Sequence, residues 1–266
     1  VMTKVLKQAP IAKYSRMIAV GGVRGENTVP NSEIVEAIDS SDEWIQSRTG
    51  IKTRARARAD EDVLDLATAA ALDVIAKSGI DPAEIDTVIL STVTYFHQTP
   101  AGAAIVADRI GANPAAAFDI SAACAGYCYG IGQADALVRA GTARNVLVIG
   151  AEKMSDFTDP TDRSISFILG DGAGAALVGA SDSPGIGPTV WGSDGSKAPL
   201  IAQTHAWSEY REGNTEWPTL RQEGPSVFKW AVWGLAPIAQ QALEAAGVTA
   251  EDIDVFIPHQ ANARII

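Results

Sequence analysis

Cysteine, histidine and long hydrophobic runs are scarce in this chain, whose 266 residues include 2 cysteines and 3 histidines. Two cysteines cannot make the disulfide framework of a small secreted protein. The longest apolar runs, such as residues 146–149 and 255–257, have the length of a strand and are too short to cross a bilayer. Lys4 and Lys7 are not followed by an apolar stretch, so no signal peptide is expected. We therefore expect a reduced, cytoplasmic protein with no membrane partner.

Basic residues are also few, since 21 lysines and arginines face 32 acidic residues and leave a formal net charge of −11. This balance argues against nucleic acid as a partner, because phosphate binding requires a basic surface. One local exception is the alternation of Lys52, Arg54, Arg56 and Arg58. We interpret this run as a solvated strand face or loop.

Strand-length apolar runs alternate with alanine-rich helical stretches, which is typical of parallel sheets covered by helices. The apolar spacing predicts a helix over residues 62–77 that Gly79 ends. A capped turn at 81–84 and a strand at 87–90 follow it. The expected fold class is therefore α/β.

A second unit repeats this order, with a helix over 240–246, Gly247, a turn at 249–252 and a strand at 254–257. Gly247 lies 168 positions after Gly79. A second set of matches recurs at an offset of 170: Val20, Gly22 and Gly25 with Val190, Gly192 and Gly195. Two matches at nearly the same offset indicate an internal duplication.

The duplication predicts two similar domains, 1–180 and 181–266. The first would carry Cys124 and the second His259. Only 86 residues follow residue 180, so we expect the second half to be incomplete and the chain to be part of a longer protein.

Cys124 lies where a predicted strand, 115–120, passes into a predicted helix, 125–139. At such a turn the unpaired N–H groups and the helix dipole favour a nucleophilic thiolate and can hold an oxyanion. From this turn alone, a buried structural cysteine is an equal alternative. Cys128 would share a helix face with Cys124, and we interpret it as a small core residue, because a metal site needs more ligands.

His259 follows the predicted strand 254–257, and residues just beyond strand ends line the sites of parallel α/β proteins. Pro258 fixes the turn, and Asn262 and Arg264 add polar groups. The two other histidines, His97 and His205, lack such a setting and are expected on the surface or in loops.

The segment 40–50 adds an aromatic residue beside a cation. Ser40 and Glu43 have the spacing of a capping box that opens a short helix. Trp44 and Arg48 are four residues apart and would share one face of that helix. An aromatic ring beside a guanidinium suits an adenine ring and its phosphates.

Four motifs follow one another in an order that resembles β-ketoacyl-acyl-carrier-protein synthase III: DSSDEW with RTGI at 39–51, FDISAACAG at 118–126, GDGAG at 170–174 and PHQAN at 258–262. The resemblance covers essentially the whole chain. It implies a thiolase-like fold of two pseudo-repeated halves in α-β-α-β-α layers, the second half truncated here, and a homodimer. It also implies an acyltransferase that starts fatty acid synthesis by condensing an acyl-CoA primer with malonyl-acyl-carrier protein. Neither a cofactor nor a metal is implied.

By this resemblance Cys124 carries the acyl group, and His259 stabilises the enolate together with an asparagine from a Gly-Asn-Thr motif. In the family that motif lies beyond the point where this chain ends. Gly213-Asn214-Thr215 has the same letters but sits in a polar stretch far before His259, and we interpret it as a loop.

The resemblance also assigns binding roles. Trp44 and Arg163 resemble the pair that encloses the adenine of CoA, although Ser164 replaces a frequent glycine. Arg48 and Asn262 are expected near the phosphates and pantetheine of CoA. The expected walls of the pantetheine tunnel are Gly224, Phe228 and Ala261. The expected carrier-protein contacts are Lys229 and Arg264. Thr99 matches an acyl-channel position, where a small residue would leave room for branched or longer primers.

Several alternatives differ in class. A starter-unit ketosynthase or acyltransferase of a polyketide pathway would have the same fold and cysteine chemistry. A biosynthetic thiolase is disfavoured because that class lacks the PHQAN run, and a non-catalytic partner subunit because Cys124 and His259 are both present. A nicotinamide-binding protein is disfavoured since the glycine-rich run 170–174 leads into a predicted strand, 175–178, instead of a helix.

Overall fold

The computed structural model describes residues 11–213 and 215–265. Lys4, Lys7, Asn214 and Ile266 therefore lie outside the described residues. The chain forms two compact units. These units are defined by contacts between residues, whereas the predicted halves are defined by sequence repetition. The boundary at residue 180 between the predicted halves therefore stays a prediction. The first unit comprises Val1–Val23, Val63–Ala151 and Ala173–Gly187, and the second comprises Arg24–Asp62, Glu152–Gly172 and Pro188–Ile266.

The first unit is built around a five-stranded sheet with the strand order β1-β7-β6-β4-β5. Strand β4 pairs in parallel with both β5 and β6, as expected of the predicted α/β fold. The strands are β1 Tyr14–Arg24, β4 Thr87–Ser91, β5 Ala116–Ile120, β6 Asn145–Lys153 and β7 Asp171–Ser181. The glycine-rich run at 170–174 thus leads into strand β7, as predicted.

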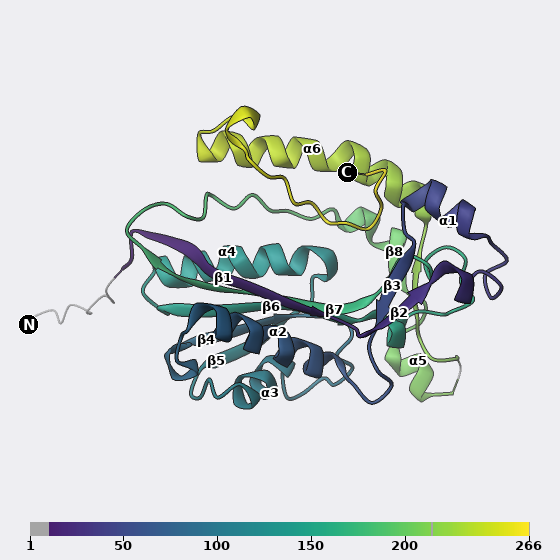
Figure 1. The fold of residues 1–266 in the computed structure, drawn as a ribbon, viewed down its shortest axis with the longest axis horizontal. Coiled ribbons are helices and arrows are strands. Elements are labelled where there is room, and N and C mark those ends of the chain that lie inside the picture. The colour runs from purple at the N-terminus through teal and green to yellow at the C-terminus, as the bar shows by residue number, and fades with distance from the viewer. Residues whose placement is uncertain (1–10, 214, 266) are drawn as a thin grey trace, which may run out of the picture. The chain divides into compact units, whose positions relative to one another are not determined.

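Helices cover both faces of this sheet (Figure 1). They are α2 Val63–Ser78, α3 Gly102–Arg109 and α4 Gly126–Arg139. Successive residues of a strand point to opposite faces, and β4 shows this alternation. Val88 and Leu90 pack in the core cluster with α2 and α3, whereas Ile89 packs in the cluster with α4. The predicted helix 62–77 and strand 87–90 are confirmed to within a residue.

Helix α4 begins close against the sheet, at Gly126. A side chain at Gly126 would collide with the Oγ of Ser91 and would lie 2.9 Å from its Cβ. Every fourth residue from Gly126 to Val138 is buried, so this face packs on the sheet. Cys128 lies two residues away from that face and is exposed. The prediction that Cys128 is a core residue is therefore wrong.

The second unit contains two small antiparallel ribbons and three helices. β2 pairs with β3, and β8 pairs with β9. The elements are β2 Asn27–Pro30, α1 Asp42–Thr49, β3 Thr53–Arg56, β8 Ile201–Gln203, α5 Trp207–Arg211, β9 Leu220–Gln222 and α6 Gly224–Ala246. Short 3-10 helices join them, including Met154–Phe157 and Ala250–Asp252.

Asp171 is the buried charge around which this unit is organised. Its carboxylate accepts hydrogen bonds from the backbone N–H of Ala57 at 2.9 Å and of Ser155 at 2.8 Å, and from the Ser155 hydroxyl at 2.7 Å. Nη1 of Arg56 lies 3.7 Å from the same carboxylate. The Asp171 carbonyl also accepts from the N–H of Gly25.

The basic run at 52–58 is only partly solvated, contrary to the prediction. Arg54 is buried, and its guanidinium donates to the carbonyl of Val29 and to the side chain of Asn31. Burial lowers the pKa of Arg54 below its ordinary value. Arg56 turns toward Asp171. Arg54 and Arg56 share one face because they occupy every second position of β3, whereas Lys52 and Arg58, just outside the strand, are exposed.

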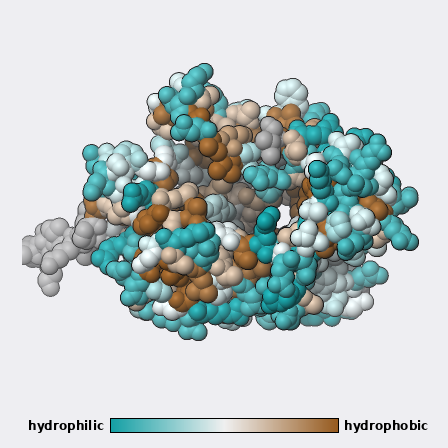
Figure 2. All heavy atoms as spheres, viewed as in Figure 1, coloured by the Kyte–Doolittle hydropathy of each residue, from teal (hydrophilic) through white to brown (hydrophobic). Residues whose placement is uncertain are grey.

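The predicted strand at 254–257 is not formed. The helix end at Ala246, Gly247 with a φ of 71° and the turn Ala250–Asp252 match the prediction, although α6 begins at Gly224 and not at 240. Val255, Phe256 and Ile257, however, are 67%, 69% and 77% exposed. A strand requires neighbours for its backbone, and the described residues place none beside this segment, whereas β4 has two. Figure 2 shows hydrophobic residues among hydrophilic ones on the molecular surface.

No described helix is long and apolar enough to cross a membrane.

The contact between α4 and Ser91 predicts that Gly126→Ala is destabilising. The new Cβ would press on the Ser91 Cβ, which cannot rotate away, and we expect a loss of about 1–3 kcal/mol in the free energy of unfolding. Urea denaturation measures it. Gly234→Ala in α6 is the matched control, since its Cβ would meet Trp230 at an ordinary 3.7 Å and gain about 0.5–1 kcal/mol of helix propensity. Equal stability of Gly126→Ala and wild type would contradict the prediction.

Candidate functional site

Cys124 sits in a strained turn between β5 and α4. The residue before it, Ala123, has a φ of 45°, in the left-handed region that residues with a Cβ avoid. Cys124 occupies a single 3-10 turn, Ala123–Ala125, directly before the first residue of α4. Neither cysteine forms a disulfide, and both are exposed. The predicted strand-to-helix turn is confirmed, and it presents an exposed thiol where the helix dipole favours negative charge.

The strand that leads to this turn also fixes the segment after Thr99. Asp119 in β5 accepts hydrogen bonds from the backbone N–H groups of Gly102 at 2.7 Å and Ala103 at 2.8 Å. These are orphan donors at the start of α3, and a carboxylate is well placed to satisfy them. Thr99 is exposed three residues before that helix. Asp119 thus ties the expected acyl-channel segment to the strand that leads to the Cys124 turn.

In the second unit, Trp44 lies between three side chains. Cζ of Arg163 is 5.3 Å and Cζ of Arg48 is 5.9 Å from the Trp44 ring centroid. The Phe167 ring meets Trp44 edge-on, with centroids 5.6 Å apart. Arg163 and Arg48 are exposed, and Trp44 is half-buried. An aromatic face with two guanidinium groups can bind a nucleobase and its phosphates.

Helix α1, which carries Trp44 and Arg48, is fixed at both ends. The Ser41 side chain accepts from the N–H of Trp44, so Ser41 is the N-cap, and the predicted capping box from Ser40 is wrong by one residue. Gly50 ends the helix with a φ of 77°, a conformation that suits glycine. The predicted spacing of Trp44 and Arg48 on one face is confirmed by their contact.

The segment that follows His259 is bonded to the end of α1. The N–H of Ala263 donates to the carbonyl of Thr49, and the Asn262 side chain accepts from the N–H of Arg264 at 2.9 Å. His259 is accessible to solvent, yet the protein around it desolvates it in part, and this burial lowers the pKa of His259 below its ordinary value. At neutral pH its imidazole is therefore uncharged, with one N–H to donate.

The expected pantetheine and carrier-protein residues lie on α6 and on this C-terminal segment. Gly224 is the first residue of α6, and Phe228 and Lys229 lie one turn later. Cζ of Arg264 is 5.3 Å from the Phe228 ring centroid, so these two predicted residues are in contact. Lys229 and Arg264 are both exposed. Ala261 and Asn262 are half-buried in the same segment.

The structure thus brings the predicted residues together in groups. Trp44, Arg48 and Arg163 form one group, and Phe228 and Arg264 form another, all within the second unit. Cys124 and Thr99 belong to the first unit, and His259 to the second. The two remaining histidines, His97 and His205, are exposed as predicted.

Sequence reasoning missed two residues that contact the loop of Arg163. Trp217 and Gln222 donate hydrogen bonds to backbone carbonyls of that loop. Three large aromatic residues within the polar stretch 204–219 were an available signal, because aromatic residues gather where a loop must pack.

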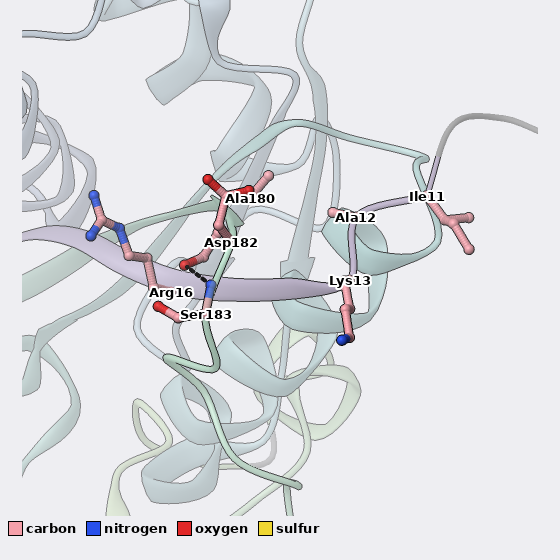
Figure 3. Close-up of a pocket in the computed structure, with 8 residues that line it drawn as sticks. Ile11, Ala12, Lys13, Arg16, Ala180, Asp182 and Ser183 are labelled. Carbon is pink, nitrogen blue, oxygen red and sulfur yellow. Dashed lines mark hydrogen bonds between the residues drawn. The ribbon is translucent and has the colours of Figure 1, made fainter.

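A surface pocket of about 690 Å³ lies beside the start of β1 (Figure 3). It is lined by Ile11, Ala12, Lys13, Arg16, Ala180, Ser181, Asp182 and Ser183. None of the predicted site residues lines it, and it holds neither cysteine nor histidine. Across the described residues, no cluster of three His, Cys, Asp or Glu side chains could hold a metal ion.

Comparison with known proteins identifies the family. Residues 118–195, which include Cys124, match the model of the 3-oxoacyl-[acyl-carrier-protein] synthase III family. The chain is 55% identical to a β-ketoacyl-[acyl-carrier-protein] synthase III of Streptomyces glaucescens, over 100% of this chain and 80% of that protein. It is 50% identical to the mycobacterial β-ketoacyl-[acyl-carrier-protein] synthase III of Mycobacterium avium, over 94% of this chain and 75% of that protein.

Solved structures agree. A priming β-ketosynthase from a polyketide biosynthetic pathway superposes with a TM-score of 0.94 at 45% identity, covering 97% of this chain and 78% of that one. The 3-oxoacyl-[acyl-carrier-protein] synthase III of Aquifex aeolicus gives a TM-score of 0.84 at 36% identity, covering 95% and 78%. The chain therefore has the thiolase-like α/β fold and belongs to the β-ketoacyl-acyl-carrier-protein synthase III family of condensing acyltransferases.

Proposed function

We propose that Cys124 is the nucleophile that accepts the acyl group of an acyl-CoA primer. The observation that carries this proposal is the strained turn that holds an exposed thiol directly before α4. The Cys124 thiolate attacks the thioester carbonyl, the bond from that carbon to the CoA sulfur breaks, and CoA leaves as a thiol after protonation. The acyl group remains on Cys124 as a thioester. The helix dipole at the start of α4 favours the negative charge of the oxyanion.

Trp44 and Arg163 bind the adenine of CoA in this proposal, with Arg48 and Asn262 near its phosphates and pantetheine. The contacts of both arginines with the Trp44 ring support it. Gly224, Phe228 and Ala261 line the path of pantetheine. Exposed Lys229 and Arg264 supply positive charge to an acidic carrier protein, on a chain whose net charge is −11.

The second half-reaction is the condensation. The bond between the malonyl group and its carboxylate breaks, CO₂ leaves, and the electron pair forms an enolate on the malonyl thioester. His259 donates its N–H to the enolate oxygen, and the carbanion then attacks the acyl carbonyl on Cys124. A carbon–carbon bond forms, and the Cys124 sulfur leaves. The lowered pKa of His259 supports a role as a neutral donor.

We further propose that the protein is a cytoplasmic homodimer that needs no cofactor. No cofactor takes part beside acyl-CoA and malonyl-acyl-carrier protein. A reduced, cytoplasmic location suits a nucleophile that must remain a thiol. A homodimer is supported by β5, which among the described residues pairs only with β4 and leaves Phe118 36% exposed at the sheet edge.

A second candidate function is starter-unit selection in a polyketide pathway. The structural likeness to a priming β-ketosynthase, with a TM-score of 0.94, favours it. Both functions use the same two half-reactions and differ in the carrier protein that supplies the malonyl group. Comparing condensation rates with malonyl groups on a fatty-acid carrier and on a polyketide carrier separates the two.

Cys124→Ala is expected to abolish covalent labelling by acyl-CoA, because no other thiol occupies the turn before α4. Intact-mass spectrometry after incubation with acyl-CoA measures the label. Cys128→Ala is the matched control, since it removes the other exposed thiol and leaves the turn unchanged. An unlabelled wild type, or full labelling of Cys124→Ala, would defeat the proposal.

The pH dependence of condensation is expected to follow His259. Because its pKa lies below the ordinary value near 6.5, the neutral donor persists as the pH falls through 6.5. The condensation rate should therefore decline only at lower pH, when the imidazole gains a proton and the enolate oxygen no longer meets a neutral donor. Rates from preformed acyl-enzyme and malonyl-acyl-carrier protein test this across pH 5–8. An acid limb at or above 6.5 that His259→Gln removes would refute it.

Thr99 is proposed to leave room for primers larger than acetyl. Wild type should then be acylated by isobutyryl- and lauroyl-CoA as well as by acetyl-CoA. Thr99→Phe should lower the rates for the two larger primers by roughly tenfold relative to acetyl-CoA. Gln98→Ala, in the neighbouring exposed position, serves as the control. Strict acetyl preference in the wild type would overturn this assignment.

A further inference from the structure

The backbone on both sides of Arg163 is hydrogen-bonded to a distant hairpin. Nε1–H of Trp217 donates to the carbonyl of Asp156 at 3.1 Å. Nε2–H of Gln222 donates to the carbonyl of Ser164, the residue directly after Arg163, at 2.9 Å. Both donors belong to the hairpin formed by β8, α5 and β9. The residues that they bond are about sixty positions earlier in the chain.

An aromatic cluster reinforces this attachment. The Phe157 ring, which belongs to the Arg163 loop, stacks on Trp207 with centroids 6.4 Å apart. Trp207 in turn lies 5.0 Å from Trp217, and Tyr210 meets Trp217 edge-on at 5.4 Å. These rings are about 40% exposed on the hairpin. These ring contacts hold the Trp217 indole so that its N–H stays at the Asp156 carbonyl. Without them, the exposed Trp217 side chain could rotate away from that carbonyl at little cost.

After the buried residues Phe157 and Thr158, the turns at 159–164 are closed by side chains of the loop itself. Asp159 accepts from the N–H of Thr161 at 2.8 Å, and Asp162 accepts from the N–H of Ser164 at 2.7 Å. Such local turns set the shape of the loop but not its position. The Arg163 side chain is half exposed, and its ion pair with exposed Asp39 is long, at 3.9 Å. A surface pair of this kind contributes little.

We propose that Trp217 and Gln222 are positioning residues, which hold the loop backbone so that the Arg163 guanidinium lies over Trp44 and receives the adenine of acyl-CoA. This inference rests on the proposed adenine site. It assigns the β8–β9 hairpin a role in selecting a nucleotide-bearing thioester over a shorter one. The nucleophile turn belongs to the other unit and carries neither anchor.

The test compares two thioesters that differ only in the nucleotide, acetyl-CoA and acetyl-pantetheine. The second-order rate constant for acylation of Cys124 is measured for each by mass spectrometry, and their ratio is the readout. Trp217→Phe retains a ring but loses the N–H, and Gln222→Ala removes the amide. Gln240→Ala is the matched control, because the amide of Gln240 donates to Glu244 one turn later in α6 and not to the Arg163 loop.

We expect the Trp217→Phe/Gln222→Ala variant to lower the acetyl-CoA to acetyl-pantetheine ratio roughly three- to tenfold. Acetyl-pantetheine should react at the wild-type rate. In an Arg163→Ala background the same two changes should have no further effect on the ratio, because the group that they position is gone. Gln240→Ala should leave both rates unchanged.

The outcomes separate this inference from the proposed function. If Arg163→Ala itself leaves the ratio unchanged, the adenine site is wrong, and the positioning role is overturned with it. If Arg163→Ala lowers the ratio and the Trp217/Gln222 variant does not, only the positioning role is overturned. Equal losses for both thioesters would show that the hairpin supports folding alone, which also overturns it.

Discussion

The second unit depends on one buried carboxylate, that of Asp171. Burying a charge is costly unless it is paired and hydrogen-bonded, and here two backbone N–H groups, a hydroxyl and Arg56 surround it. Through these bonds Asp171 joins the end of β3 to Ser155, at the start of the loop that carries Arg163. Removing the carboxylate would leave the half-buried Arg56 and two backbone donors without it. The loop that carries Arg163 to Trp44 is therefore attached at its start to a buried charge.

The sequence predicted best what is decided locally. Helix α2, strand β4 and the turn at Cys124 follow from apolar spacing, glycines and helix ends within short windows, and each appeared within a residue or two. The contact of Trp44 with Arg48 follows from a spacing of four residues on one helix. The resemblance supplied Arg163, which no local pattern links to Trp44 across about 120 positions of sequence.

The sequence predictions that proved wrong share one physical cause, which is packing against segments that are distant in the sequence. Arg54 is buried where the Val29 carbonyl and the Asn31 side chain accept hydrogen bonds from its guanidinium, and these partners lie on β2 and directly after it. Cys128 is exposed because the close approach at Gly126 fixes which face of α4 meets the sheet. Residues 254–257 have the composition of a buried strand, but a strand forms only beside another strand. In each case the deciding partner is remote in sequence, so a local pattern could not reveal it.

The side chains of the proposed adenine site must move apart to admit a base. The Arg163 Cζ lies 5.3 Å from the Trp44 ring centroid, whereas an adenine between them needs two stacking gaps, or about 7 Å. The guanidinium must therefore move outward by about 2 Å, while the loop keeps its place. A backbone anchored at Asp156 and Ser164 permits this, because the long arginine side chain alone has to rotate. The weak ion pair with Asp39 offers little resistance. In the proposed site, a loop backbone that is fixed before binding reduces the ordering entropy that would otherwise weaken the affinity for CoA.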